Sequence, residues 1–217
     1  MQEINLLSKL PPSERNVAAR SESKTPEHIA ISRKYDFDYF DGEREYGYGG
    51  FRYDGRWLPV AKDIIDYFDL RAGDRVLDIG CAKGFLVKDM LIACPGLEVF
   101  GIDISRYALL NCEPEVLGRL HLCNAKLLPF PDNSFSAVIS INTLHNLDKH
   151  ECIQALNEIQ RVSNGRAYVQ VDSYRTLEEK EIFEKWVLTA KYHGYPDDWI
   201  KTFKLAGYTG DYNWTIV

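Results

Sequence analysis

The chain has 217 residues, the length of one domain or of one domain with a small cap. Its 26 Lys and Arg against 32 Asp and Glu give a formal net charge of −6, which argues against a protein that holds nucleic acid through its phosphates. No apolar run approaches the roughly 18–20 residues that span a bilayer, so a membrane partner is not expected.

The five cysteines are scattered along the chain, with no C-x-x-C pair and no Cys/His ligand set. This pattern supports neither a disulfide framework nor a structural metal. The N-terminus also lacks the apolar core and the cleavage site of a secretory signal. We therefore expect a cytoplasmic protein without a metal site.

Three segments differ in composition. Residues 1–34 are polar and contain three prolines, which predicts a disordered or loosely attached arm. Residues 35–57 are dense in aromatic residues and glycine, a mixture that suits an ordered loop or cap. The third segment, 56–217, has the alternating apolar patterns of a folded domain.

Within this domain the apolar spacing predicts alternating strands and helices. Strands are expected at 75–80, 98–104, 119–125, 136–141, 166–171 and within 211–217, and helices at 56–70, 85–92, from 105, 147–162, 177–192 and 196–206. This order predicts an α/β fold with a Rossmann-like, doubly wound, mostly parallel sheet covered by helices on both faces. Ligands of such sheets bind at the carboxyl ends of the strands, so functional residues are expected there.

The first strand is followed by a turn that contains Gly80, Ala82 and Gly84. Small residues at alternate positions let the backbone approach a ligand closely. A dinucleotide site would need glycine where Ala82 stands. Asp78 would repel a pyrophosphate but suits a ligand with a cationic amino group nearby. The alternative is an ordinary turn between a strand and a helix.

Two more strand ends carry polar side chains. The carboxylate of Asp103 could accept both hydroxyls of a ribose, or it could cap the helix that follows. The amide of Asn124 could bond the edge of a purine ring, or its loop could only cover the edge of the sheet with apolar residues. Both readings of each residue stay open on the sequence alone.

In combination, VLDIGCAKG (76–84), GIDIS (101–105) and CNAKLLPFPDNSFSAVISINTLHNL (123–147) resemble the class I S-adenosylmethionine-dependent methyltransferases. The third segment is similar to the small-molecule branch that includes the quinone C-methyltransferases. The resemblance covers roughly residues 56–171 and implies S-adenosyl-L-methionine as the cofactor. Ala82 replaces a glycine of the family pattern, and Asn124 replaces a residue that is usually acidic.

The resemblance also implies which residues bind the cofactor. Asp78 would orient its amino group, Asp103 would bind the ribose hydroxyls, and Ile104 would pack on adenine. The full set that it assigns to the cofactor is Tyr48, Arg56, Asp78, Gly80, Cys81, Gly84, Asp103, Ile104, Asn124, Ala125 and Asn142.

Methyl transfer is an in-line displacement at a sulfonium, so the protein chiefly positions the nucleophile and excludes water. His145, after the fourth strand, is the candidate general base, with a packing histidine as the alternative. Asp172, after the fifth strand, could hold a hydroxyl or amine of the acceptor.

The leading hypothesis is a methyltransferase that acts on an O, N or C atom of a small molecule, such as a sugar or secondary-metabolite intermediate. Its partner would be that small-molecule acceptor. The alternatives are a non-catalytic S-adenosylmethionine-binding partner subunit and a nicotinamide oxidoreductase, which Asp78 and Ala82 disfavour. The family sheet normally ends in an antiparallel strand pair, and here the seventh strand is either missing or supplied by a second copy. A homodimer therefore stays open.

Overall fold

The computed structural model describes residues 1–12, 15–49 and 51–217. Its sheet has the strand order β3-β2-β1-β4-β5-β6, and every neighbouring pair is parallel. The strands are β1 (Arg75–Ile79), β2 (Glu98–Asp103), β3 (Leu120–Leu122), β4 (Ala137–Ile141), β5 (Ala167–Asp172) and β6 (Asp211–Thr215). This is the doubly wound, Rossmann-like sheet predicted from the sequence.

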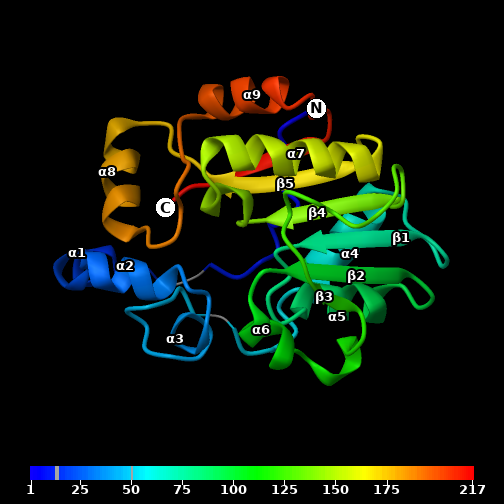
Figure 1. The fold of residues 1–217 in the computed structure, drawn as a ribbon, viewed down its shortest axis with the longest axis horizontal. Coiled ribbons are helices and arrows are strands. Elements are labelled where there is room, and N and C mark those ends of the chain that lie inside the picture. The colour runs from blue at the N-terminus through cyan, green and yellow to red at the C-terminus, as the bar shows by residue number, and fades with distance from the viewer. Residues whose placement is uncertain (13–14, 50) are drawn as a thin grey trace.

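Helices cover both faces of the sheet (Figure 1). The helices are α1 (Val17–Ser23), α2 (Pro26–Ser32), α3 (Phe37–Phe40), α4 (Leu58–Tyr67), α5 (Phe85–Ala93), α6 (Arg106–Leu110), α7 (Lys149–Ser163), α8 (Leu177–Trp186) and α9 (Pro196–Leu205), with short 3-10 helices at Pro114–Val116 and Leu144–Asn146. One apolar core lies between the sheet and α4 and α5, and a second lies between the sheet and α7 and α9.

The strand sequences explain this two-sided burial. Successive residues of β1 point to opposite faces, so Val76 joins the core under α4 and α5, whereas Leu77 and Ile79 join the core under α7. The strand is apolar on both sides because both faces are covered. Helix α7 is defined locally as well, since Asp148 and Glu151 form a capping box at its start and Asn164 ends it in a left-handed conformation.

The N-terminal segment differs from the loosely attached arm that the sequence predicts. Leu6 and Leu7 are buried in the core with α4 and α5. The backbone N–H of Ile4 donates to the carbonyl of Tyr212 (2.9 Å), and the N–H of Tyr212 donates to the carbonyl of Gln2 (3.1 Å). A polar composition concealed this attachment, because two leucines and a few backbone hydrogen bonds are enough to fix the segment.

The sheet edge beyond β6 is occupied by the same segment. Glu3 forms a parallel bridge with Tyr212 of β6. Within the described residues, the sheet has no antiparallel pair, so the antiparallel strand pair that ends the family sheet is missing there. No helix in the described ranges has the length and apolar character needed to cross a membrane.

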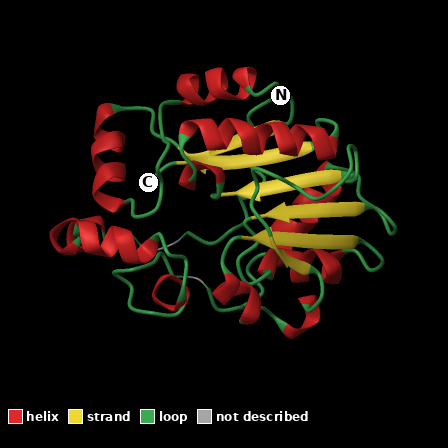
Figure 2. Cartoon of the chain, viewed as in Figure 1, coloured by secondary structure: helices red, strands yellow, loops and turns green. Residues whose placement is uncertain are grey.

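The carboxyl ends of the strands all point toward one side of the molecule, where α1, α2, α3 and α8 lie (Figure 2). The described residues of the segment 35–57, which connects α2 to α4, also lie there. Its rings pack on one another: Phe40 contacts Phe51 with centroids 4.7 Å apart and Tyr39 with centroids 4.9 Å apart. The aromatic cap expected from composition is therefore an ordered cluster over the strand ends.

Candidate functional site

A cavity of about 580 Å³ opens between the strand ends and the cap. Its lining includes every candidate residue except Gly84: Tyr48, Arg56, Asp78, Gly80, Cys81, Asp103, Ile104, Asn124, Ala125, Asn142, His145 and Asp172. Residues scattered over 125 positions of sequence therefore meet in one site, as the parallel topology predicts (from 48 to 172).

The turn after β1 depends on backbone conformations that favour glycine. Gly80 has φ +80°, and a Cβ there would lie 2.0 Å from Oγ1 of Thr143. Ala82 also has a positive φ, +50°, at the position where the resembling family has glycine. Gly84 begins α5 outside the cavity and packs against Val116 and Leu120, so in this structure its contacts are structural.

Asp78 is the buried charge of the cavity. Its side chain, at the end of β1, is 5% exposed and has no hydrogen-bond partner within the described ranges. Burial, and secondarily the charge of Asp103, raises the pKa of Asp78 to about 7. An isolated buried carboxylate is costly, so a ligand that brings a cationic group to Asp78 would be favoured.

Asp103, at the end of β2, is held by backbone donors. Its Oδ2 accepts from the N–H of Ala82 (2.8 Å) and its Oδ1 accepts from the N–H of Ser105 (2.7 Å). Burial raises its pKa, although these hydrogen bonds oppose the shift. Each carboxylate oxygen retains a lone pair for a ligand hydroxyl. The cap of α6 is the hydroxyl of Ser105, which excludes the capping alternative for Asp103.

An apolar surface lies next to Asp103. Ile104 is 52% exposed at the cavity, and Ala125 is buried on the same lining. The amide oxygen of Asn124 accepts from the N–H of Lys126 (3.0 Å), which fixes its orientation. An exposed isoleucine that shares the cavity lining with a carboxylate and an oriented amide is suited to a flat, nitrogen-containing ring.

The cap is fastened to the segments that follow β1 and β2 by contacts that could not be predicted from the sequence. Nζ of Lys83, in the glycine turn, lies 2.6 Å from Oδ1 of Asp41, and Tyr107 donates to Oδ2 of Asp41 (2.7 Å). The hydroxyl of Ser105 donates to the carbonyl of Tyr35 (2.6 Å). The position of Lys83 in the glycine-rich turn could have marked it as a residue of interest. Its partner Asp41 could not be predicted, because it lies 42 residues away in the sequence.

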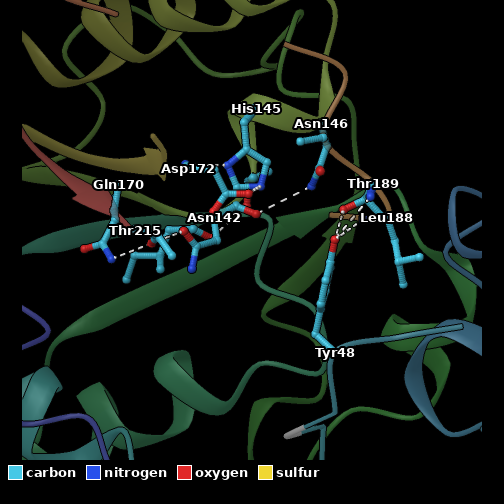
Figure 3. Close-up of polar contacts among 12 residues, drawn as sticks. Tyr48, Asn142, His145, Asn146, Gln170, Asp172, Leu188, Thr189 and Thr215 are labelled. Carbon is cyan, nitrogen blue, oxygen red and sulfur yellow. Dashed lines mark hydrogen bonds and ion pairs between the residues drawn. The ribbon is translucent and has the colours of Figure 1, made fainter. Parts of the chain in front are cut away.

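Tyr48 and Arg56 line the cavity with their polar groups already engaged. The hydroxyl of Tyr48 accepts from the N–H groups of Leu188 (2.6 Å) and Thr189 (3.2 Å), which joins the cap to the loop after α8 (Figure 3). Nε of Arg56 donates to both carboxylate oxygens of Asp54 (2.9 and 2.8 Å). Their assignment to the cofactor stays a prediction.

His145 and Asp172 lie together at the ends of β4 and β5 (Figure 3). Nδ1 of His145 accepts from the backbone N–H of Asp172 (2.9 Å), and its Nε2 lies 3.4 Å from Oδ2 of the same residue. Burial lowers the pKa of His145 and raises that of Asp172. Because Nδ1 accepts a hydrogen bond, the neutral ring carries its proton on Nε2, which faces the carboxylate.

Asn142 takes part in a second polar chain at the same strand ends. Its Oδ1 accepts from the hydroxyl of Thr215 (2.7 Å), which in turn accepts from Nε2 of Gln170 (2.9 Å). Cys81 is buried in the turn after β1, and burial raises its pKa well above the ordinary value. A protonated, buried thiol is not a nucleophile, so Cys81 contributes shape to this site.

These features fit the cofactor that the resemblance implies. The buried Asp78 suits a cationic amino group, Asp103 suits two neighbouring hydroxyls, and Ile104 with Ala125 suits a purine. No group of three or more metal-ligating side chains was found in the described part of the chain.

Comparisons with known proteins agree. A family model described as a methyltransferase domain matches residues 76–165. The demethylmenaquinone methyltransferase of Symbiobacterium thermophilum is 33% identical over 116 residues, which are 50% of this chain and 45% of that protein. The ubiquinone/menaquinone biosynthesis C-methyltransferase UbiE of Burkholderia mallei is 32% identical over 149 residues, which are 66% of this chain and 55% of that protein. This chain thus spans about half the length of these curated relatives.

Among solved structures, the YcgJ protein of Bacillus subtilis has the same fold, with a TM-score of 0.54 over 70% of this chain and 68% of that one. At 20% identity this likeness concerns the fold alone. The sequence matches and the residues at the strand ends provide the evidence for a methyltransferase domain. Residues 76–165 therefore form a methyltransferase domain similar to the class I S-adenosylmethionine-dependent methyltransferases, a family whose cofactor is S-adenosyl-L-methionine.

Proposed function

We propose that this chain transfers a methyl group from S-adenosyl-L-methionine to a small molecule. The observation that carries the proposal is Asp78, a buried carboxylate with no hydrogen-bond partner in the described ranges, placed on the cavity beside the Asp103 carboxylate. A nicotinamide dinucleotide would bring a pyrophosphate to this turn, and Asp78 would repel it. The cavity of about 580 Å³ falls in the range of small-molecule sites.

When bound, the cofactor supplies an electrophilic methyl group on a sulfonium. In the proposal, Asp78 binds its amino group, Asp103 its ribose hydroxyls, and Ile104 its adenine. The cap keeps water from the site, and the contact between Lys83 and Asp41 holds the cap in place. The protein's main contribution is then to orient the acceptor atom for in-line attack.

Proton removal is assigned to Asp172 rather than to His145. The Nδ1 lone pair of His145 is occupied by the N–H of Asp172, so the neutral imidazole has no lone pair left to accept a proton from an acceptor. The raised pKa of Asp172 makes its carboxylate a better proton acceptor than an exposed aspartate. His145 would then be a positioning residue, which directs its Nε2–H toward Asp172.

The acceptor would be a small metabolite, such as a sugar or secondary-metabolite intermediate, as expected from the sequence. The relatives named above are quinone methyltransferases by name, and the proposal does not extend their quinone substrates to this chain. We also propose that the protein works in the reducing, cytoplasmic compartment expected from its scattered cysteines. All five cysteines are free thiols.

The test is methyl transfer from radiolabelled S-adenosyl-L-methionine to a panel of small hydroxy, amino and enol compounds. The proposal predicts label in at least one compound with the wild-type chain and none with Asp103→Ala. A panel that includes phosphorylated, carboxylated and neutral members covers the acceptor classes. Tight cofactor binding without transfer to any compound would instead favour the non-catalytic partner subunit.

A further inference from the structure

The cavity carries more positive charge than a protein with a net charge of −6 would lead one to expect. Among the described residues, six cationic side chains line it, namely Arg15, Arg33, Arg44, Arg56, Lys126 and Lys191. Four carboxylate side chains of the same residues line it as well, namely Asp78, Asp103, Glu151 and Asp172. The distribution of these charges over the cavity indicates what kind of molecule it accepts.

Two of the cations are neutralised by carboxylates at the cavity wall. Lys126 forms an ion pair with Glu151, and Arg56 forms one with Asp54. On the cofactor side, Asp78 and Asp103 are matched to an amino group and to ribose hydroxyls. Asp172 is then the only lining carboxylate side chain of the described ranges that remains for Arg15, Arg33 and Lys191.

Arg15 and Arg33 have donors to spare. Nη1 of Arg15 donates to the carbonyl of Ile216 (2.9 Å), and Nη2 of Arg33 donates to the carbonyl of Ala190 (3.1 Å). Neither forms an ion pair with a carboxylate of the described residues, and Lys191 forms none there either. A guanidinium has five N–H donors, so each arginine is fixed by one hydrogen bond and can still bind an anion.

Arg15 and the backbone of Lys191 lie beside the His145 and Asp172 pair, and Arg33 is held by the residue before Lys191. The N–H of Lys191, next to the Ala190 that holds Arg33, donates to the carbonyl of His145 (2.9 Å). Arg15 is near enough to Asp172 for its charge to lower the pKa of that carboxyl. Figure 3 shows the same loop, at Leu188 and Thr189, across from His145 and Asp172. Positive charge therefore lies on the side of the cavity that holds the proposed proton acceptor.

We infer that the methyl acceptor carries an anionic group, a phosphate or a carboxylate, which Arg15, Arg33 and Lys191 bind beside Asp172. The term acceptor rests on the proposed function, whereas the anion site rests on the cavity alone. Because Arg15 and Arg33 belong to the N-terminal segment, that segment would form part of the acceptor site. Planar guanidinium groups suit both anions, since each offers a pair of oxygens for bidentate bonding.

The experiment titrates inorganic pyrophosphate and, separately, malonate into the protein by calorimetry, with and without saturating S-adenosylhomocysteine. Arg15→Gln and Arg33→Gln remove a charge but keep an amide donor for the carbonyl that each arginine holds. Arg33→Lys restores the charge at that position. Arg71→Gln is the matched control, because Arg71 is an exposed arginine already paired with Asp69.

We expect one of the anions to bind the wild-type complex, and Arg15→Gln and Arg33→Gln each to weaken that binding about tenfold. Arg33→Lys should recover part of the loss, Arg71→Gln should behave as wild type, and the affinity for S-adenosylhomocysteine should not change in any of the four. Tighter binding of pyrophosphate than of malonate would identify a phosphorylated acceptor, and the reverse order would identify a carboxylic acid.

Three results would overturn the inference. The first is a wild-type complex that binds S-adenosylhomocysteine but neither anion. The second is an equal loss of anion affinity in Arg71→Gln. The third is a fall in S-adenosylhomocysteine affinity in Arg15→Gln or Arg33→Gln, which would mean that the arginine binds the carboxylate of the cofactor. Anion binding that depends on Arg33 in a protein that does not bind S-adenosylhomocysteine would reject the proposed function and retain the anion site.

Discussion

The carboxylates of Asp78 and Asp103 stand at the ends of two neighbouring strands, near enough for the charge of Asp103 to help raise the pKa of Asp78 to about 7. Burial is the larger cause of the shift. Two carboxylates that face one cavity make it unfavourable for anions at that side and favourable for a cationic amino group. Cofactor binding should therefore depend on pH in a defined direction.

The ordinary pKa of the Asp78 carboxyl is 3.8, and folding raises it to about 7. Between these values the folded protein holds a proton that the unfolded chain has released. The stability from this group is therefore present in full below about pH 4 and is lost as the pH rises through about 7. A bound ammonium favours the ionised form, so the affinity for S-adenosylhomocysteine should rise about tenfold from pH 5.5 to 7.5. Calorimetry at both pH values measures this rise, and the same rise in Asp78→Asn would contradict the assignment.

Asp103→Ala should weaken binding of S-adenosylhomocysteine by about 2–4 kcal/mol, because two charge-assisted hydrogen bonds to ribose are lost. Asp103→Asn keeps an oxygen acceptor and should fall between this variant and the wild type. Asp69→Ala, at an exposed carboxylate outside the cavity, is the control for calorimetry. Wild-type affinity in Asp103→Ala would rule out the ribose contact.

Lys83→Met should loosen the cap, since it removes the ion pair with Asp41 and leaves that carboxylate without its closest cation. We expect S-adenosylhomocysteine to bind about tenfold more weakly and limited proteolysis to cleave within 35–57 more quickly. The double variant Lys83→Met/Asp41→Asn should lose no more affinity than Lys83→Met alone, because the two residues act as a pair. Losses that add in full would show that the two residues act independently.

Asp172→Asn should abolish most turnover and leave the affinity for S-adenosylhomocysteine unchanged, because it removes the proposed proton acceptor without touching the cofactor side. His145→Gln should reduce turnover less and shift its pH profile, as expected for a positioning residue. Both rates are to be measured with an acceptor found in the panel. Wild-type turnover in Asp172→Asn would show that Asp172 is not the general base.

Leu6→Ala should lower the free energy of unfolding by about 2–5 kcal/mol, the usual cost of truncating a buried leucine. Leu205→Ala, at a leucine that is 69% exposed, should change it by less than about 0.5 kcal/mol. Urea unfolding followed by circular dichroism gives both values. Equal stability of Leu6→Ala and the wild type would mean that the N-terminal segment is not anchored as described.

The sequence predicts those parts of the fold that local pattern determines. Helix α7 is an example, because its apolar spacing, its Asp148 cap and its stop at Asn164 all lie within the element. The attachment of the N-terminus could not be found this way. Glu3 pairs with Tyr212 across almost the whole chain, and nothing near Glu3 in sequence indicates that partner.

In the site, too, residues marked by local sequence could be predicted, whereas contacts between distant residues could not. Asp78 and Asp103 could be identified because each lies at the end of a recognisable strand. The proton arrangement at His145 could not, since it depends on a backbone N–H from Asp172 that only the folded sheet brings to Nδ1. Arg15 and Arg33 were hidden for a similar reason: they lie in a polar segment, and the fold rather than the motif brings them to the cavity.

The central claim is that the strand-end cavity binds S-adenosyl-L-methionine through Asp78 and Asp103. Calorimetric titration of the wild-type chain with S-adenosylhomocysteine tests it most directly, with NADH as the competing ligand and Asp103→Ala as the control. The account predicts micromolar binding of S-adenosylhomocysteine, no binding of NADH, and a large loss in Asp103→Ala. Binding of NADH in place of S-adenosylhomocysteine, or equal binding by Asp103→Ala, would contradict it.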